Sequence, residues 1–449
     1  MRTALINIIK IKQGKCRFEG EHYLNIHSFL SLPLETNPNQ CNCLDDEALV
    51  FNPPVFKRQF CKNTNRAVQY FQSSDVQMSS ENSDVYIFKQ QAESLNLLVK
   101  ENDILITGFG TIGNVRLVSK LQNNTCYANN VCRVRVNTGG KYGFLYAFLS
   151  SKYGKAQLNK NASGSVVRYI EAPGIKKTLI PHFSTSLRLE IDSLIQESAQ
   201  MREEAMSALW EAHRIIEMNF NVASKKKSSR VSIQTILSSH NKRFEAFYHT
   251  SENRSVYDYI IKNFDYKTLG DITERIFRPG IFKREYVANG VTFLGGADIL
   301  MSIPDSDKKL SYRQVDKMPE LKVKKDWILV TCGGTIGNTV LIDSQLEKCA
   351  ISQHVMRIVP KDDILKGYLY AVLSSSIGKE LITMFTTGSV IPQIEAHHLE
   401  LVPIPLLEKD VMENIDNLVS SYVSKIEISK EKEIRAIRMV EQEIEKWNN

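Results

Sequence analysis

The sequence predicts an α+β fold in which two tandem mixed α/β domains are separated by two long antiparallel helices, with a pseudo-two-fold relation between the halves. Two observations predict this fold. One set of short motifs occurs twice, and each copy ends in a long helical segment without proline or glycine. Helices of this length with an apolar stripe need a partner helix, and pairing the two with each other is the simplest solution.

The internal repeat has a period of 224 residues over most of its length. Residues 104–114 return as 328–338, and residues 143–155 match 367–379 with nine identities in thirteen positions. Upstream the offset becomes 226, where Phe56-Lys57-Arg58 returns as Phe282-Lys283-Arg284. A period this long exceeds that of a solenoid repeat, so each copy is expected to be a domain.

Each copy contains the same kinds of segment in the same order. Short apolar runs typical of strands come first, a short helix follows around Leu145 or Leu369, and a helix with apolar residues three and four positions apart ends the copy. The expected boundaries are a first globular domain at 1–185, a central long helix at 186–222, a linker at 223–242, a second globular domain at 243–408 and a C-terminal long helix at 409–449.

Composition limits the class of protein. The formal net charge of +7 favours a polyanionic partner. No apolar run approaches about eighteen residues, and the N-terminal residues lack the apolar core of a secretion signal, so no membrane contact and a cytoplasmic location are expected. Of the eight cysteines, Cys41 and Cys43 form the one close pair, without a histidine or cysteine pair to match, which favours reduced thiols over a metal site.

Two motifs suggest ligand-binding loops but fit turns better. Residues 108–113 read G-x-G-x-x-G, yet a strand-like run follows where a dinucleotide site needs a helix, and Cys332 replaces the first glycine in the second copy. Asn52-Pro53-Pro54-Val55 lacks the aromatic residue of a methyltransferase base-binding loop. Since no nuclease-type acidic array or phosphate loop is found either, we expect no catalytic, cofactor-binding or metal site in this chain.

The combined order of motifs resembles the specificity subunits of type I restriction–modification enzymes and related recognition subunits of some type II systems, which contain two target-recognition domains separated by long helices. The resemblance covers essentially the whole chain. The matching segments are residues 17–20 and 243–246, the turns at 110–114 and 334–338, residues 387–394 and residues 401–407. Copy one departs from the pattern at residues 167–169, and residues 25–90 barely align with copy two.

The resemblance implies a restriction–modification, DNA-binding subunit that is not itself an enzyme and serves in defence against foreign DNA. Its partners would be double-stranded DNA, two methyltransferase subunits that use S-adenosylmethionine and, in the full enzyme, restriction/translocase subunits that use ATP and Mg²⁺. The paired helices would form a coiled coil, and a helix of about 34 residues spans roughly 50 Å, which predicts a two-part target with a fixed gap. Charged residues on the helices, among them Arg202, Glu203, Glu204, Glu431, Lys432 and Glu433, are candidate docking surfaces or simply solvated.

The candidate DNA-binding residues are basic or amide side chains that the sequence places on loops, since such groups contact guanine and adenine in the major groove. They are Lys57, Arg58, Arg168, Lys283, Arg284 and Gln393. For the paired basic residues, a phosphate contact or a solvated strand edge stays open beside base recognition. Thr111, Asn114, Thr335 and Asn338 belong to a turn shared by both copies, and a shared motif cannot encode two different half-sites, so a structural role is expected for them.

Other functions stay open at this point. The chain could be the recognition subunit of a fused type II nuclease–methyltransferase polypeptide, whose subunit content would differ. It could also be a duplicated enzyme with an unrecognised active site, or a helical scaffold that does not bind nucleic acid. Salt-sensitive binding to duplex DNA would separate the last possibility from the others.

Overall fold

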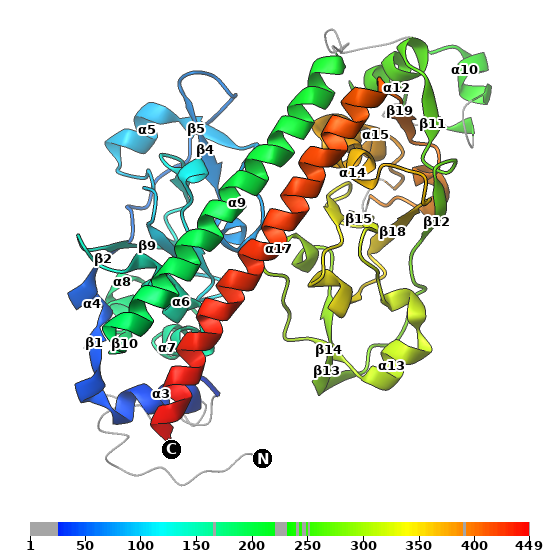
Figure 1. The fold of residues 1–449 in the computed structure, drawn as a ribbon. Coiled ribbons are helices and arrows are strands. Elements are labelled where there is room, and N and C mark those ends of the chain that lie inside the picture. Colours follow the sequence, from blue (N-terminus) through cyan, green and yellow to red (C-terminus); the bar gives the residue numbers. More distant parts are fainter. Residues whose placement is uncertain are drawn as a thin grey trace. The chain divides into compact units, whose positions relative to one another are not determined.

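The computed structural model describes residues 26–164, 168–220, 231–238, 242–244, 248–249, 252–388 and 392–448. It contains two compact units. Unit 1 combines the described residues up to Glu203 with those from Ile428 onward, and unit 2 runs from Glu204 to Glu427. Each unit therefore holds one copy of the repeat and one part of each long helix, which the colours of Figure 1 allow the reader to trace.

Unit 1 contains three small sheets and several short helices besides the long ones. Its strands are β1 (Cys41–Cys43), β2 (Ala48–Phe51), β3 (Phe60–Cys61), β4 (Ala67–Phe71), β5 (Tyr86–Phe88), β6 (Ile104–Thr107), β7 (Val115–Leu117), β8 (Cys126–Tyr127), β9 (Val131–Val136) and β10 (Leu179–Pro181). Its helices are α3 (Ile26–Thr36), α4 (Leu44–Glu47), α5 (Lys89–Ser94), α6 (Tyr142–Ser150), α7 (Lys152–Lys160), α8 (Ala172–Ile175) and the first part of α9 (Thr185–Asn219).

A four-stranded antiparallel sheet in the order β2-β9-β6-β7 lies at the centre of unit 1. Because neighbouring side chains of a strand point to opposite faces, Ile104 and Ile106 pack into one core and Leu105 into another. The first core also contains α6 and the long helices. The second core contains Tyr70 and Tyr127 of the sheet β3-β5-β4-β8, so the central sheet is buried on both faces.

Unit 2 has its own set of elements. Its strands are β11 (Tyr266–Thr268), β12 (Thr273–Phe277), β13 (Tyr286–Leu294), β14 (Lys309–Leu310), β15 (Ile328–Thr331), β16 (Thr339–Leu341), β17 (Ala350–Ile351), β18 (Val355–Pro360) and β19 (Pro403–Pro405). Its helices are α10 (Ile233–Ser238), α12 (Glu252–Asn263), α13 (Tyr312–Lys317), α14 (Lys366–Ser374), α15 (Ser376–Met384), α16 (Ala396–Leu399) and the first part of α17 (Lys409–Glu445).

The strand order of unit 2 repeats that of unit 1. The sheet β12-β18-β15-β16 corresponds to β2-β9-β6-β7, and the parallel pair of β13 with β17 corresponds to that of β4 with β8. Leu329 of β15 packs against Leu294 and Ile351 on the far side of the sheet from α14, as Leu105 does in unit 1. The expectation of two mixed α/β copies is therefore confirmed.

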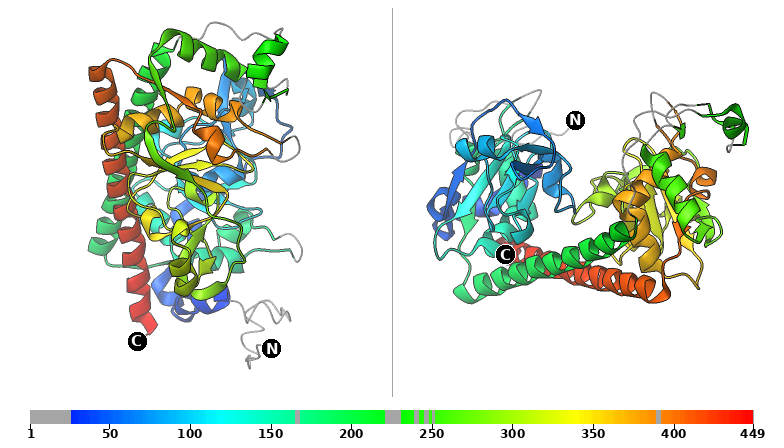
Figure 2. Two further views of the ribbon diagram at one scale, coloured as in Figure 1. Left: turned by 90° about the vertical axis from the view of Figure 1, so that its right-hand side faces the viewer. Right: turned by 90° about the horizontal axis from the view of Figure 1, so that it is seen from above.

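The two long helices pair in antiparallel fashion, as predicted (Figure 1, Figure 2). Helix α9 has 35 residues and α17 has 37. In unit 1, Ile191 and Ile195 share the core with Val440 and Ala436, and the Ser198 hydroxyl donates to the carbonyl of Ser429 at 2.8 Å. The pseudo-two-fold relation of the units stays a prediction.

One expectation about these helices is wrong. Glu433 was placed on an exposed docking face, but it is 4% exposed. Its carboxylate accepts a hydrogen bond from the Tyr146 hydroxyl at 2.6 Å and pairs with Arg202 at 2.7 Å. A carboxylate with two such partners can be buried, and burial with these partners removes Glu433 and most of Arg202 from any docking surface. Glu431 is exposed as expected.

Several sequence motifs lie outside the described residues. They include residues 17–20, residues 389–391 of the motif at 387–394, and most of the expected linker at 223–242. The described part of that linker contains α10. None of the described helices combines the length and the apolar character that crossing a membrane requires.

Candidate functional site

Each unit presents a glycine turn between two antiparallel strands. In unit 1 it joins β6 to β7, and Gly110 and Gly113 adopt positive φ angles of 76° and 83°. The Thr107 hydroxyl donates to the carbonyl of Thr111 at 2.5 Å and accepts from the Asn114 amide at 3.0 Å. Because a strand follows the turn, the interpretation of this motif as a strand connection rather than a dinucleotide loop is confirmed.

Unit 2 forms the same turn with the same hydrogen bonds. The Thr331 hydroxyl donates to the carbonyl of Thr335 at 2.6 Å and accepts from the Asn338 amide at 3.1 Å. Gly334 and Gly337 have φ angles of 77° and 87°. These bonds close the turn on itself in both units, which gives the recurring threonine and asparagine positions a structural role.

The Phe-Lys-Arg segment lies on an exposed loop in each unit, which we call the basic loop (residues 55–58 in unit 1 and 281–284 in unit 2). The phenylalanine is partly buried and packs against a core, whereas the aliphatic residue before it is exposed, at 87% for Val55 and 94% for Ile281. The basic residues after it are exposed as well: Lys57, Arg58, Lys283 and Arg284. Each loop is therefore anchored at one side chain and presents the others to solvent.

A glutamine from a short helix fixes the basic loop of unit 1. Gln91 Nε2 donates to the carbonyl of Lys57 at 2.9 Å, and its Oε1 accepts from the Gln59 amide at 3.2 Å. Arg58 Nε donates to the Tyr70 hydroxyl at 2.6 Å, with the guanidinium 5.6 Å from the ring centre. Burial raises the pKa of Tyr70, and Arg58 opposes that rise.

Unit 2 repeats this arrangement from a different sequence. Gln314 Nε2 donates to the carbonyl of Lys283 at 2.7 Å, and its Oε1 accepts from the Glu285 amide at 3.0 Å. Arg284 donates to the side-chain oxygen of Gln353 at 3.3 Å. We call Gln91 and Gln314 the clamp glutamines. They hold the backbone at the lysine and two residues beyond it in one conformation, which orients the exposed cations.

The remaining two predicted residues lie beside the glycine turns. The Arg168 guanidinium is half-buried and donates to the carbonyl of Asn159. The Gln393 side chain is exposed, while its backbone exchanges two hydrogen bonds with Thr387 at 2.8 and 2.9 Å. Gln393 also bridges to Gly333 of the turn.

The structure connects the basic loop to the glycine turn in both units. In unit 1, Asn52 donates to the carbonyl of Asn129 at 3.5 Å and accepts from the amide of Ala172 at 2.8 Å, so the loop that Asn52 begins is tied to both neighbours of the turn. In unit 2, Arg278 at the matching position pairs with Glu395 at 2.5 Å. In each unit, the segment that leads into the basic loop is therefore bonded to a segment next to the turn.

A buried arginine holds the segment behind that surface and was not singled out from the sequence. Arg133 and Arg357 occupy the same position of the repeat, and both are fully buried. Arg357 donates to the carbonyls of Ser352 at 2.8 Å and Val355 at 2.5 Å, and also to that of Ile351. Burial lowers the pKa of both guanidiniums. In the described residues their hydrogen bonds go to backbone carbonyls and not to a carboxylate, which would oppose this lowering.

Arg133 makes the corresponding contacts in unit 1. It donates to the carbonyls of Val131 at 2.9 Å, Leu97 at 3.0 Å and Tyr127 at 3.0 Å. The only signal for this role in the sequence is the recurrence of an arginine within an otherwise apolar strand, at the same offset of 224. Each arginine fixes the turn that leads into β9 or β18, and that turn carries Asn130 or His354.

The long helices are fastened to each globular part by an aspartate. The amide of Gly143 donates to Asp192 Oδ1 at 2.8 Å, and that of Gly367 to Asp416 Oδ1 at 2.7 Å. A Cβ on Gly143 would lie 2.7 Å from the carbonyl oxygen of Asp192, so this approach requires glycine. The negative aspartate also suits the N-terminal end of α6 or α14.

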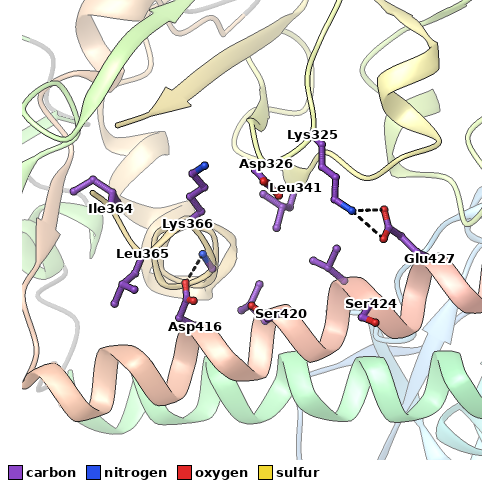
Figure 3. A pocket seen from close by; sticks show the side chains of 13 residues that line it. Lys325, Asp326, Leu341, Ile364, Leu365, Lys366, Asp416, Ser420, Ser424 and Glu427 are labelled. Carbon is purple, nitrogen blue, oxygen red and sulfur yellow. Dashed lines mark hydrogen bonds and ion pairs between the residues drawn. The ribbon is translucent and has the colours of Figure 1, made fainter. Parts of the chain in front are cut away.

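A second fastening differs between the units and borders a polar groove in unit 2 of about 520 Å³ (Figure 3). Glu427 accepts from the Ser344 amide at 2.9 Å and pairs with Lys325 at 3.1 Å. Burial would raise the pKa of Glu427, but these hydrogen bonds outweigh it and lower the pKa. Ser420 and Ser424 line the groove, and Figure 3 shows both on the helix face that also carries Asp416 and Glu427.

In unit 1 the matching glutamate has a like-charged neighbour instead. Glu203 accepts from the Lys120 amide at 2.7 Å, but Glu101 stands at the repeat position of Lys325. Burial raises the pKa of Glu203, and Glu101 raises it further. The fastening of the helix in unit 1 therefore depends on pH in the opposite sense to that in unit 2.

Across the described ranges, no three histidine, cysteine or acidic side chains gather in a way that could hold a metal ion. The side chains that recur on the surface of both units are instead the cations of the basic loop and the amide of the clamp glutamine. Such a surface can bind an anionic, base-bearing polymer by charge, hydrogen bonding and stacking.

Comparison with known proteins gives matches of three kinds: a family model, a curated relative and solved structures. Residues 261–438 match the family model "Type I restriction modification DNA specificity domain". The type I restriction enzyme MjaIX specificity subunit of Methanocaldococcus jannaschii is 23% identical over 177 residues, which are 38% of this chain and 40% of that protein. The match thus spans two fifths of the length of that curated relative.

Two solved structures are similar along most of the chain. One is the S subunit of a type I restriction–modification system from M. genitalium, at 13% identity and a TM-score of 0.31, covering 91% of this chain and 95% of that one. The other is the HsdS subunit from Thermoanaerobacter tengcongensis, at 16% identity and a TM-score of 0.28, with the same coverage.

Proposed function

We propose that this chain is a type I restriction–modification DNA specificity subunit, which binds double-stranded DNA at specific sequences and directs separate catalytic subunits to them. The observation that carries the proposal is the basic loop, which recurs in both units with the same core anchor, the same exposed cations and a clamp glutamine. A loop that is kept in this form in two diverged copies serves a task common to both.

That common task is contact with the DNA backbone. Phosphates are the same at every position of a duplex, so a motif shared by two units can bind them without encoding a sequence. Lys57, Arg58, Lys283 and Arg284 are exposed cations on a fixed backbone, which suits this role. Arg168 and Gln393, beside the turns, are proposed as further contacts to DNA.

Each unit would bind its own half of a two-part target. The proposal rests on the duplication, because two copies of one binding unit whose surfaces differ call for two different half-sites. A continuous helix pair would then set the gap, and helices of 35 and 37 residues are long enough for roughly 50 Å. Shortening both helices by whole turns should shorten the gap and leave the half-sites unchanged.

Chemistry would come from partner subunits in the cytoplasm. Two methyltransferase subunits would bind S-adenosylmethionine, and restriction subunits would bind ATP and Mg²⁺, in a complex that acts against foreign DNA. The resemblance and the matched domain support this division of labour. The chain would contribute recognition and would bind none of these cofactors.

Salt dependence of binding tests the proposal. We expect the full chain to bind a duplex that contains its target with an affinity that falls steeply with salt concentration, because bound phosphates release counterions. The plot of log K against log salt has a negative slope, and Lys283→Ala should make it less steep by about 0.9 if that lysine contacts one phosphate. Lys409→Ala, which removes an exposed charge at the start of α17, is the matched control and should leave the slope unchanged. Absence of salt-sensitive duplex binding by the wild-type chain would refute the proposed function.

A further inference from the structure

Three segments of the chain meet at the glycine turn of unit 1, where backbone hydrogen bonds join them. The amide of Gly108 donates to the carbonyl of Asn130 at 3.0 Å, and the carbonyl of Gly108 accepts from the amide of Ile170 at 2.8 Å. Phe109 therefore lies between the segments that carry Asn130 and Tyr169.

The same backbone arrangement occurs in unit 2 at the same repeat offset. The amide of Cys332 donates to the carbonyl of His354 at 3.0 Å, and the carbonyl of Cys332 accepts from the amide of Ile394 at 3.2 Å. Gly333 therefore lies between the segments that carry His354 and Gln393. The buried arginines fix the second of these three segments in both units.

We call these positions the variable triad: Phe109, Asn130 and Tyr169 in unit 1, and Gly333, His354 and Gln393 in unit 2. The backbone at these positions is the same in both units, but none of the three side chains is. This is the reverse of the basic loop, where side chains and backbone both recur. A position that varies on a fixed backbone is where two copies of a binding unit can acquire different specificities.

The side chains of the triad differ chemically between the units, and in unit 1 the two aromatic ones are exposed while Asn130 is half-buried. In unit 1, the rings of Phe109 and Tyr169 stack with centres 5.5 Å apart and planes 12° from parallel, and each residue is 37% exposed. Asn130 donates to the Ser73 hydroxyl at 3.2 Å, while its buried Oδ1 accepts no hydrogen bond within the described part of the chain. The surface of unit 1 is thus an aromatic face, and the unsatisfied acceptor of Asn130 is buried beside it.

Unit 2 offers a polar surface at the same place. His354 and Gln393 are exposed, and Gly333 leaves room that a side chain there would fill, since its Cβ would lie 3.5 Å from His354 Nδ1. Gln353, next to His354, already contacts Arg284 of the basic loop. The triad of unit 2 therefore continues directly from the cations proposed to hold the phosphates.

We propose that the variable triad determines which bases each unit recognises, an inference that rests on the proposed DNA-binding function. Glutamine can bond adenine in bidentate fashion, and an imidazole can donate to or accept from a purine edge in the major groove, whereas an aromatic face contacts the thymine methyl group. Unit 1 then recognises its half-site with a large apolar component, and unit 2 recognises its own by hydrogen bonds from His354 and Gln393.

Exchange of the triad between units tests the inference. The full chain, with the subunits that co-purify with it, is used to select duplexes from a random pool, and the enriched sequences are read. In unit 2, His354→Asn and Gln393→Tyr together should change the preferred base at one or more positions of one half-site, with the other half-site and the gap unchanged. The matched control is Lys283→Ala/Arg284→Ala, which should weaken selection without changing the motif.

The reciprocal change in unit 1, Phe109→Gly with Asn130→His and Tyr169→Gln, should alter the other half-site. Because this variant loses the stability that the aromatic stack contributes, the unit 2 variant, whose exposed side chains bury little, decides the outcome. An unchanged motif from a folded unit 2 variant overturns the inference and leaves the proposed function in place. A wild-type chain that enriches no motif overturns both.

Discussion

Removal of a clamp glutamine should weaken DNA binding without removing a charge. In Gln314→Ala the backbone at Lys283 and Glu285 loses two hydrogen bonds, of 2.7 and 3.0 Å. The two cations of the basic loop remain, but the backbone segment that bears them is no longer held in place. Binding then has to restore a conformation that the wild-type chain already holds.

The size of the effect follows from those two bonds. A hydrogen bond contributes about 0.5–1.5 kcal/mol net, and the site is exposed, so a loss of about 1–2 kcal/mol of loop order is expected. If the loop must be ordered to bind, the apparent Kd rises by the inverse of the ordered fraction. A change of this size corresponds to roughly a 5- to 30-fold higher Kd.

Fluorescence anisotropy with a labelled target duplex measures this change at several salt concentrations. The Kd should rise for Gln314→Ala at every concentration, while the slope against log salt stays that of the wild type, because the same phosphates are contacted. Gln314→Glu keeps the acceptor for the Glu285 amide and should have a smaller effect on loop order. Wild-type affinity for Gln314→Ala, or a slope reduced as in Lys283→Ala, would refute the reasoning.

Two further predictions concern stability and one concerns the pKa of a carboxyl group. Arg357→Met should destabilise the fold by about 3 kcal/mol in urea unfolding, since buried carbonyls lose their donor, and an unchanged midpoint would contradict the role given to this arginine. Burial lowers the pKa of His213 to about 4, so below about pH 6.5 the unfolded chain binds a proton that the folded chain does not, and stability should fall by about 2–3 kcal/mol between pH 7 and 4.5. His213→Gln should lack this component, and parallel pH profiles for the two chains would contradict it. Glu101→Lys should lower the pKa of Glu203, measured by NMR titration, because it replaces a like charge with an opposite one; a pKa that stays or rises would show that Glu101 does not act on Glu203.

The repeat made most of the fold predictable. The glycine turn, the short helix around Leu145 or Leu369 and the long helices each have a local pattern, and each pattern occurs twice. The strand-like run after Gly113 favoured a turn between strands over a dinucleotide loop, and the structure confirms the turn.

The contacts that shape the candidate site were less predictable. Gln91 and Gln314 are polar residues on short helices, in a region where the copies barely align, and nothing in a polar stretch marks the one side chain that clamps a distant backbone. Glu433 was misplaced because a charged residue on a helix is usually solvated, and only the tertiary partners Tyr146 and Arg202 show why it is buried. Arg133 could have been noticed from its recurrence, but its carbonyl partners are set by the fold.

The central claim is that this chain gives a restriction–modification complex a two-part target, one half for each unit. Single-molecule mapping of methylated bases in cells with and without the intact gene tests it most directly. We expect methylation at an asymmetric motif of two short half-sites with a fixed gap, and we expect it to disappear when the chain is absent. A single continuous motif, or a methylation pattern that is the same without the chain, would contradict the claim.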